Sequence, residues 1–230
     1  MAETLSEPRA TGATENLTDR LRITEIFYSL QGEADTVGWP TVFIRLTGCP
    51  LRCHYCDTAY AFQGGEWLSL SDIMAVTHAY GARYVTVTGG EPLAQKACLP
   101  LLQQLCDAGY RVSLETSGAL DVAGVDPRVV KVMDLKTPSS GESARNRYAN
   151  LEALNPHDQL KMVICDRSDY DWARQQIEQY RLPAICDVLL SPGHGLLAPG
   201  ELADWLLADQ LAVRLQVQLH KYLWGDVPGR

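Results

Sequence analysis

The sequence lacks any long apolar run, because no stretch of its 230 residues approaches the ~18 apolar residues of a membrane-spanning helix. It also lacks an excess of positive charge. The 20 Lys and Arg residues stand against 28 Asp and Glu, for a net charge of −8, which excludes a broad electrostatic grip on nucleic acid. No apolar leader is found in residues 1–20. These absences predict a cytoplasmic protein with reduced thiols that binds neither nucleic acid nor a membrane.

Internal repeats and low-complexity linkers are also missing, and a composition of 46% hydrophobic and 21% charged residues is that of an ordinary globular protein. A chain of this length can bury one sizeable core. Residues 1–20 are polar and rich in small side chains, which predicts a disordered tail. Residues 21–230 are predicted to form one α/β domain.

The rest of the chain alternates between short β-branched runs and segments of helical period. The predicted strands are 22–30, 41–46, 84–89, 111–116, 129–135, 159–165, 186–191 and 214–219. The predicted helices are 69–81, 96–109, 168–180 and 199–209, with Ser71 as an N-cap and with Gly81 and Gly109 as stops. Alternating strands and helices predict a parallel sheet, open or closed, with ligands at the carboxyl ends of its strands.

An irregular segment, 47–68, separates the second predicted strand from the first helix and carries Cys49, Cys53 and Cys56 as C-x3-C-x2-C. Three thiolates this close can hold one inorganic centre at a small loop-closure cost. Two candidates remain open: a four-iron, four-sulfide cluster with one open iron, or a zinc ion whose fourth ligand is His54 or a distant cysteine. The other cysteines are expected to pack as small apolar side chains; they are Cys98, Cys106, Cys165 and Cys186.

Polar residues and glycines follow several predicted strands. Gly89 and Gly90 allow the backbone to approach a ligand closely, or form an ordinary turn. Gln31 and Glu33 offer paired hydrogen-bonding groups to an amide-like ring edge, or form a polar turn. Arg45 lies in an otherwise apolar strand and therefore needs a partner, either a substrate carboxylate or a structural Asp or Glu.

Five motifs together resemble a known family. They are FYSLQGE, FIRLTGC, YCDTAY, TGGEP and QLHKYLWG, at 27–33, 43–49, 55–60, 88–92 and 218–225. The cysteine pattern, with Tyr55 directly before its last cysteine, is similar to the signature of the radical S-adenosylmethionine superfamily. The wider set of motifs resembles the 7-carboxy-7-deazaguanine synthase family of the queuosine pathway.

The resemblance implies a single-domain, partial (β/α)6-type barrel. It implies a lyase that converts 6-carboxy-5,6,7,8-tetrahydropterin to 7-carboxy-7-deazaguanine with loss of ammonia. The implied cofactors are a 4Fe-4S cluster, S-adenosylmethionine and Mg²⁺, and the implied partners are a flavodoxin or ferredoxin as electron donor and a second copy in a homodimer. Two alternatives stay open at this point: a glycyl-radical-enzyme activating protein and a zinc-stabilised binding protein.

The resemblance also implies roles for individual residues. The substrate would contact Leu30, Gln31, Gly32, Glu33, Arg45 and Thr88. The S-adenosylmethionine would contact Tyr55, Gly89, Gly90, Glu91, Glu115, Ser117, Asp134, Leu135, Lys136 and Ser191. The cluster would be held by Cys49, Cys53 and Cys56, and the Mg²⁺ by Thr58. Two alternatives stay open: Thr58 could cap the turn that leaves the cysteine loop, and Asp57 could be the metal ligand or could cap the loop. Asp134 and Leu135 depart from the family's more usual Ser-Pro before the lysine.

Overall fold

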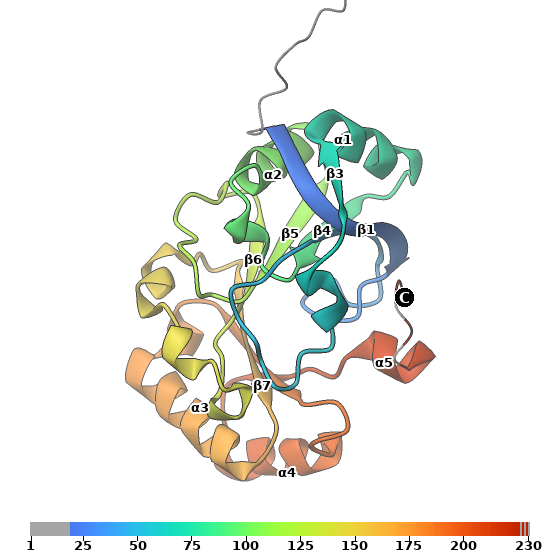
Figure 1. Cartoon of the computed structure of the whole chain (residues 1–230). Helices are drawn as coiled ribbons and strands as arrows, with labels where there is room; N and C mark the ends of the chain where they lie inside the picture. Colours follow the sequence, from blue (N-terminus) through green and yellow to red (C-terminus); the bar gives the residue numbers. More distant parts are fainter. Residues whose placement is uncertain (1–18, 226, 228, 230) are drawn as a thin grey trace, which may run out of the picture.

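A computed structural model describes residues 19–225, 227 and 229, and these residues form a nine-stranded sheet with the order β3-β1-β2-β4-β5-β6-β7-β8-β9 (Figure 1). The strands are β1 Arg20–Leu30, β2 Pro40–Leu46, β3 Glu66–Ser69, β4 Tyr84–Gly89, β5 Arg111–Thr116, β6 Val130–Asp134, β7 Gln159–Ile164, β8 Asp187–Pro192 and β9 Arg214–Leu215. All neighbours from β2 to β9 pair in parallel, whereas β1 pairs antiparallel with both β2 and β3. The predicted partial barrel is confirmed, with β2, β4, β5, β6, β7 and β8 as its core strands.

The α-helices are α1 Leu70–Ala79, α2 Cys98–Asp107, α3 Arg167–Tyr180, α4 Pro199–Asp209 and α5 Leu219–Trp224. Shorter 3-10 helices are η2 Ala59–Phe62, η3 Pro92–Ala94, η4 Pro138–Ser140, η5 Ser143–Arg145, η6 Tyr148–Ala153 and η7 Leu182–Ala184. The connection from β5 to β6 contains only turns, and that from β6 to β7 contains 3-10 helices, so neither carries an α-helix (Figure 1). None of the described helices combines the length and the apolar character needed to cross a membrane.

The two faces of the barrel strands differ in polarity, because side chains alternate along a strand. In β4, Val85 and Val87 belong to the apolar core that also contains Leu101 of α2. The intervening Thr86 and Thr88 are buried on the opposite face. The same alternation recurs in the neighbouring strands, which places the apolar core between sheet and helices and a polar face inside the barrel. We call that second face the cavity face.

Several predicted boundaries need correction. Ser69, and not Ser71, caps α1, because its hydroxyl accepts the hydrogen bond from the backbone N–H of Asp72. The predicted strand 214–219 ends at Leu215, after which the chain turns into α5. Gly81 and Gly109 do stop their helices, with φ angles of 63° and 87° that suit glycine.

Residues 1–18 of the predicted N-terminal tail, 1–20, lie outside the described residues. The last residue of the predicted tail, Arg20, is the first residue of β1.

Candidate active site

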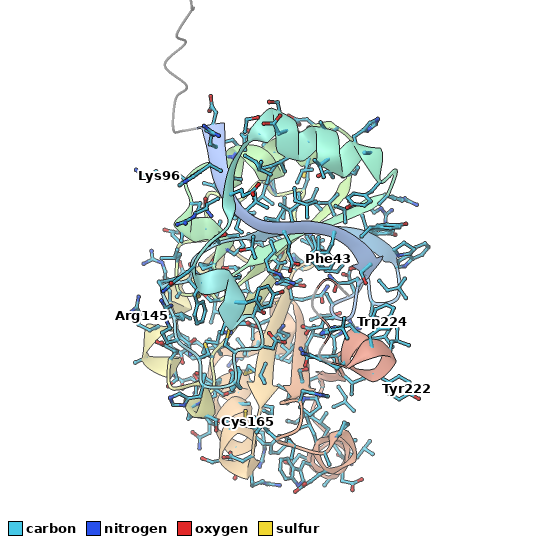
Figure 2. The ribbon with its side chains drawn as sticks, turned by 45° about the vertical axis from the view of Figure 1, so that its right-hand side comes forward. Phe43, Lys96, Arg145, Cys165, Tyr222 and Trp224 are labelled. Atoms are coloured by element: carbon cyan, nitrogen blue, oxygen red, sulfur yellow. The ribbon has the colours of Figure 1, made fainter. Side chains whose placement is uncertain are left out.

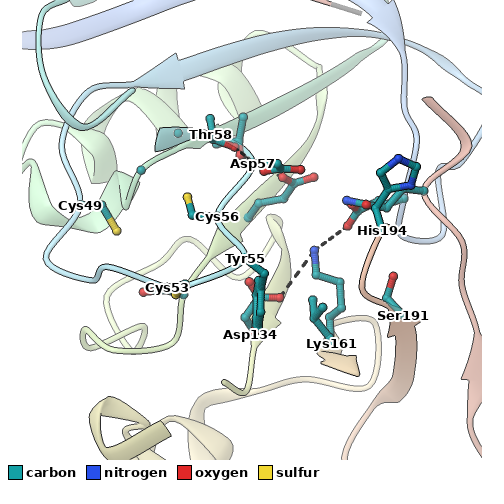
Figure 3. Close-up of a pocket in the computed structure, with 18 of the residues that line it drawn as sticks. Cys49, Cys53, Tyr55, Cys56, Asp57, Thr58, Asp134, Lys161, Ser191 and His194 are labelled. Carbon is teal, nitrogen blue, oxygen red and sulfur yellow. Dashed lines mark hydrogen bonds and ion pairs between the residues drawn. The ribbon is translucent and has the colours of Figure 1, made fainter. Parts of the chain in front are cut away.

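A cavity of about 510 Å³ opens at the carboxyl ends of the barrel strands (Figure 3). The sequence-predicted residues that line it are Glu33, Arg45, Cys49, Cys53, Tyr55, Cys56, Thr58, Thr88, Gly89, Gly90, Glu115, Ser117, Asp134, Lys136 and Ser191. Those that do not line it are Leu30, Gln31, Gly32, Glu91 and Leu135. The barrel therefore collects most of the predicted residues around one space, from the cysteine loop and from positions on or directly after β1, β2, β4, β5, β6 and β8. Their individual ligand contacts stay predictions.

The three loop cysteines face this cavity from one side, and each is half-buried (Figure 3). The loop is held in place through its backbone N–H groups: His54 N–H donates to the Ser140 carbonyl at 3.0 Å, and Arg52 N–H donates to the Glu142 carboxylate at 2.6 Å. Burial raises the pKa of the Cys53 thiol, and the nearby Lys136 ammonium opposes that rise. A half-buried trio of thiols beside a cation suits an anionic metal centre with thiolate ligands.

The geometry of the loop bears on the choice between zinc and a cluster. Among the described residues, no three His, Cys, Asp or Glu side chains lie together as ligands of a single metal ion. The ring of His54 lies against Gly141, with Nδ1 3.3 Å from the Ser139 carbonyl oxygen, so it is engaged away from the thiols. In a four-iron cluster each thiolate binds a different iron, and the sulfur atoms stay apart. The three thiols therefore fit a cluster better than a zinc ion.

The glycine turn after β4 packs directly against the cysteine loop. A Cβ atom added at Gly90 would collide with the Gly48 carbonyl oxygen and would lie 2.8 Å from the Cβ of Cys49. Gly89 has a φ of 148° and would likewise strike the backbone of Leu46. The Glu91 N–H donates to the Gly48 carbonyl at 2.8 Å. Only residues without a side chain allow this close contact between turn and loop.

Glu91 has a structural environment inside the protein. Its fully buried carboxylate accepts hydrogen bonds from the Thr116 hydroxyl and from the Ser117 N–H and hydroxyl. It also accepts from the Leu93 N–H at 3.0 Å. These bonds connect the turn after β4 to the end of β5 and the turn that follows it. The Glu91 carboxylate therefore joins these two parts of the barrel rim.

Glu115 lies among residues that the resemblance assigned to the substrate, although Glu115 itself was assigned to the cofactor. Its carboxylate accepts hydrogen bonds from Thr88 at 2.9 Å and from Gln31 at 3.4 Å. Burial raises the pKa of Glu115, against the opposing effect of the Lys161 ammonium. Gln31 also donates to Thr86 at 3.0 Å and is buried behind the cavity wall.

Arg45 is engaged within the protein as well as exposed to the cavity. Its Nε lies 2.7 Å from the Glu25 carboxylate, and its guanidinium lies over the rings of Phe27 and Tyr60. The structural ion pair weighed at the sequence level is thus present. The bond to Glu25 uses Nε, and Arg45 still lines the cavity.

Thr58 and Asp57 bring a hydroxyl and a carboxylate to the cavity lining. The Thr58 hydroxyl donates to the Asp57 carboxylate at 2.7 Å and does not cap η2. The pKa of Asp57 is below its usual value, because this hydrogen bond and the Lys221 ammonium outweigh the effect of burial. The capping role considered for Thr58 is therefore absent at η2.

Comparison with known proteins agrees with this geometry. The Radical SAM superfamily matches residues 43–137. The 7-carboxy-7-deazaguanine synthases of Chlorobaculum tepidum and Koribacter versatilis are 46% and 44% identical, over 89% of this chain and over 94% and 97% of theirs. The crystal structure of QueE from Escherichia coli matches with a TM-score of 0.73 and 26% identity, over 90% of this chain and 100% of that chain. The chain belongs to the 7-carboxy-7-deazaguanine synthase family.

Membership of the 7-carboxy-7-deazaguanine synthase family confirms the predicted enzyme class, a radical S-adenosylmethionine lyase. The two alternatives that the sequence left open, a glycyl-radical-enzyme activating protein and a zinc-stabilised binding protein, are not favoured by these relatives. The family's cofactors, a 4Fe-4S cluster and S-adenosylmethionine, fit the three thiols and the glycine turn described above.

Sequence analysis missed the part that the C-terminal segment plays in this 7-carboxy-7-deazaguanine synthase family site. Gln218 donates to Glu33 at 2.7 Å, and both Gln218 and His220 line the cavity. The Leu219 N–H donates to the Gly32 carbonyl, and a Cβ at Gly32 would collide with the His220 ring. The motif that carries Gly32 is therefore a docking point for α5, whose Tyr222 is 86% exposed and points outward (Figure 2).

Sequence analysis also missed Lys161, which lies on β7 and lines the cavity. Its ammonium contacts Glu33 and lies 3.5 Å from Asp134, while Asp134 also pairs with Lys136 at 2.6 Å. Burial alone would raise the pKa of Asp134, but the two ammonium groups hold it below its usual value. The sequence did contain a signal for Lys161, because a lysine within the apolar run 159–165 needs a partner, as Arg45 does in its own apolar strand.

Proposed function

We propose that this chain converts 6-carboxy-5,6,7,8-tetrahydropterin to 7-carboxy-7-deazaguanine with release of ammonia, as a step of queuosine biosynthesis. One observation carries the proposal. The three thiols suited to a cluster and the polar groups suited to the pterin, among them Glu33, Arg45 and Thr88, line the same cavity. The names of the relatives support this product.

In this proposal Cys49, Cys53 and Cys56, which line the cavity, would hold the 4Fe-4S cluster. When bound, the cluster and S-adenosylmethionine supply the means to remove a hydrogen atom from an unactivated carbon. The protein supplies the surroundings: Gly89 and Gly90 line the cavity, and their lack of side chains lets this turn pack against the backbone of Leu46 and Gly48. Tyr55, Ser117, Asp134, Lys136 and Ser191 complete the proposed cofactor side.

The substrate side is proposed to consist of Arg45, Glu33, Thr88 and Glu115. Arg45 offers its guanidinium to the pterin carboxylate, because a planar cation with several donors matches a carboxylate. Glu33 and Glu115 offer acceptors to the N–H edge of the pterin ring. Gln31 acts behind them, since its amide donates to Glu115 and holds that carboxylate in place.

The remaining parts of the proposal rest on the family resemblance. A flavodoxin or ferredoxin would supply the electron, two chains would form a homodimer, and the enzyme would work in the cytoplasm. Mg²⁺ is proposed to bind at Thr58, between its hydroxyl and the oxygens of the substrate.

An anaerobic assay tests the proposed function. Purified chain reconstituted with iron and sulfide, then supplied with a chemical reductant, S-adenosylmethionine and the carboxy-pterin, is expected to form 7-carboxy-7-deazaguanine and ammonia. No partner protein should be needed for turnover, in contrast to a glycyl-radical activating enzyme. Iron-loaded protein that cleaves S-adenosylmethionine but leaves the pterin unchanged would rule out the proposed substrate.

Arg45→Lys is expected to weaken substrate binding about tenfold, because lysine keeps the charge but loses the planar fork. Cleavage of S-adenosylmethionine in the absence of substrate should persist. Pterin affinity, measured by equilibrium titration of the reconstituted enzyme, checks this. Unchanged affinity would mean that Arg45 serves only its ion pair with Glu25.

Thr58→Val is expected to flatten the response of turnover to added Mg²⁺, because magnesium prefers oxygen ligands and valine removes one. Iron content should stay at the wild-type level. Thr58→Ser is the matched control, since it keeps the hydroxyl and should keep the Mg²⁺ response. A wild-type Mg²⁺ titration in Thr58→Val would show that the hydroxyl binds no metal.

A further inference from the structure

Lys161 lies between two groups that the proposed function assigns to different ligands. Its Nζ is 2.5 Å from an oxygen of Glu33, on the substrate side, and 3.5 Å from an oxygen of Asp134, on the cofactor side. Figure 3 draws this amine near the middle of the cavity, with dashed contacts in both directions. Its side chain is only 12% exposed, so bulk water cannot take over the role of its partners.

The charges around this amine are unevenly distributed. Three carboxylates, those of Glu33, Glu115 and Asp134, line the cavity and act on Lys161. Asp134 has a second cation, Lys136, at 2.6 Å. Among the described residues, Lys161 is the one cation within ion-pair distance of Glu33. A buried carboxylate without its cation is costly, so removal of Lys161 would leave an uncompensated charge at Glu33 and would weaken its hold on this position.

We propose that Lys161 is a positioning residue, whose single amine holds Glu33 toward the substrate and Asp134 toward S-adenosylmethionine. The inference rests on the proposed function and deepens it. Lys161 acts through these two carboxylates, so the proposed substrate site and the proposed cofactor site both depend on this one side chain of β7. The parallel register makes this possible, because Lys161 lies directly opposite Asp134 on the neighbouring strand β6.

The chain contains a matched control for this role. Lys131 on β6 is also buried, with its Nζ 2.8 Å from Asp158, and both side chains are almost inaccessible to solvent. Neither lines the cavity. Lys131→Met therefore removes a buried lysine from the same sheet outside the site. It should lower thermal stability and leave the ligand affinities of the folded protein within about twofold.

The test measures equilibrium binding to the reconstituted holoenzyme, with 6-carboxytetrahydropterin and S-adenosylmethionine titrated separately. Lys161→Met is expected to lower the affinity for each ligand about tenfold, because it removes a charged hydrogen bond at Glu33 and an ion pair at Asp134. Lys161→Arg should recover part of both affinities. Unchanged affinities in Lys161→Met, or losses equal to those of Lys131→Met, would overturn the proposal.

A double-mutant cycle shows whether Lys161 acts through Glu33. Pterin affinity of Lys161→Met/Glu33→Gln should equal that of Glu33→Gln alone, because the positioned carboxylate is already gone. An additive loss would mean that Lys161 contacts the pterin itself, and would overturn the positioning role.

If Lys161→Met alone does not fold, the double variant, which removes both charges of the pair, replaces it. If the double variant binds S-adenosylmethionine more weakly than Glu33→Gln does, the proposal is supported. If the two variants bind S-adenosylmethionine equally well, the proposal is overturned. Failure of the wild-type enzyme to bind the pterin would be a different result, since it would count against the proposed function.

Discussion

Cys53→Ala is expected to leave a folded protein that retains almost no iron and forms no product. A cube of four irons bound by three protein thiolates cannot lose one of them without exposing a second iron, and two ligands on a half-buried loop hold it poorly. Cys49→Ala and Cys56→Ala should behave in the same way, because all three thiols line the cavity. Iron and sulfide per chain after anaerobic reconstitution, together with product formation, measure the effect.

Cys98→Ala provides the matched control. Its thiol is fully buried in α2, and burial raises its pKa far above the usual value, so it stays protonated inside the apolar core. Its loss should cost about 1 kcal/mol in packing and leave iron content and activity unchanged. Cys165→Ala, at a half-buried position after β7, should also keep both. Iron loss from the Cys98 variant as large as that from Cys53→Ala would show that the ligand set is wrong.

Gly90→Ala is expected to impair the enzyme severely although it adds a single methyl group. The added carbon would collide with the Gly48 carbonyl oxygen and lie 2.6 Å from the carbonyl carbon, and backbone atoms cannot swing aside as a side-chain tip can. Such overpacking costs about 1–3 kcal/mol, and here the residue displaced is next to Cys49. We expect a lower melting temperature, incomplete iron loading and loss of most activity.

Gly200→Ala is the control for this substitution. Gly200 lies in the first turn of α4, and nothing lies within 4 Å of an added Cβ, so alanine should be neutral or stabilise the protein by up to about 1 kcal/mol. Full iron content and activity in Gly90→Ala would contradict the close packing of the glycine turn on the cysteine loop.

Sequence analysis missed β3 and extended the predicted strand 214–219 too far, for identifiable reasons. β3 is only Glu66–Ser69, and it exists because it pairs antiparallel with Arg20–Ile23 at the sheet edge. The run 214–219 alternates Leu, Gln, Val, Gln and Leu as a strand would, yet it leaves the sheet after Leu215. Its glutamines instead bond to distant groups: Gln216 to both backbone groups of Ala34, and Gln218 to Glu33. Tertiary hydrogen bonds overrode the local pattern.

The sequence by itself determined the features whose causes are local. Cysteine spacing placed three thiols on one loop, and alternation in β4 sent Thr86 and Thr88 to the cavity face and Val85 and Val87 to the core. The family followed from motifs that are each a few residues long.

Only the tertiary structure decided which charged groups became partners. Lys161 and Glu33 are 128 residues apart, and Arg45 and Glu25 are 20 apart. Glu91 is held by Thr116 and Ser117, from the turn after another strand. The physical reason is that a buried charge needs a partner. Apolar neighbours in the sequence reveal that a charge will be buried, whereas strand order and register decide which residue becomes its partner.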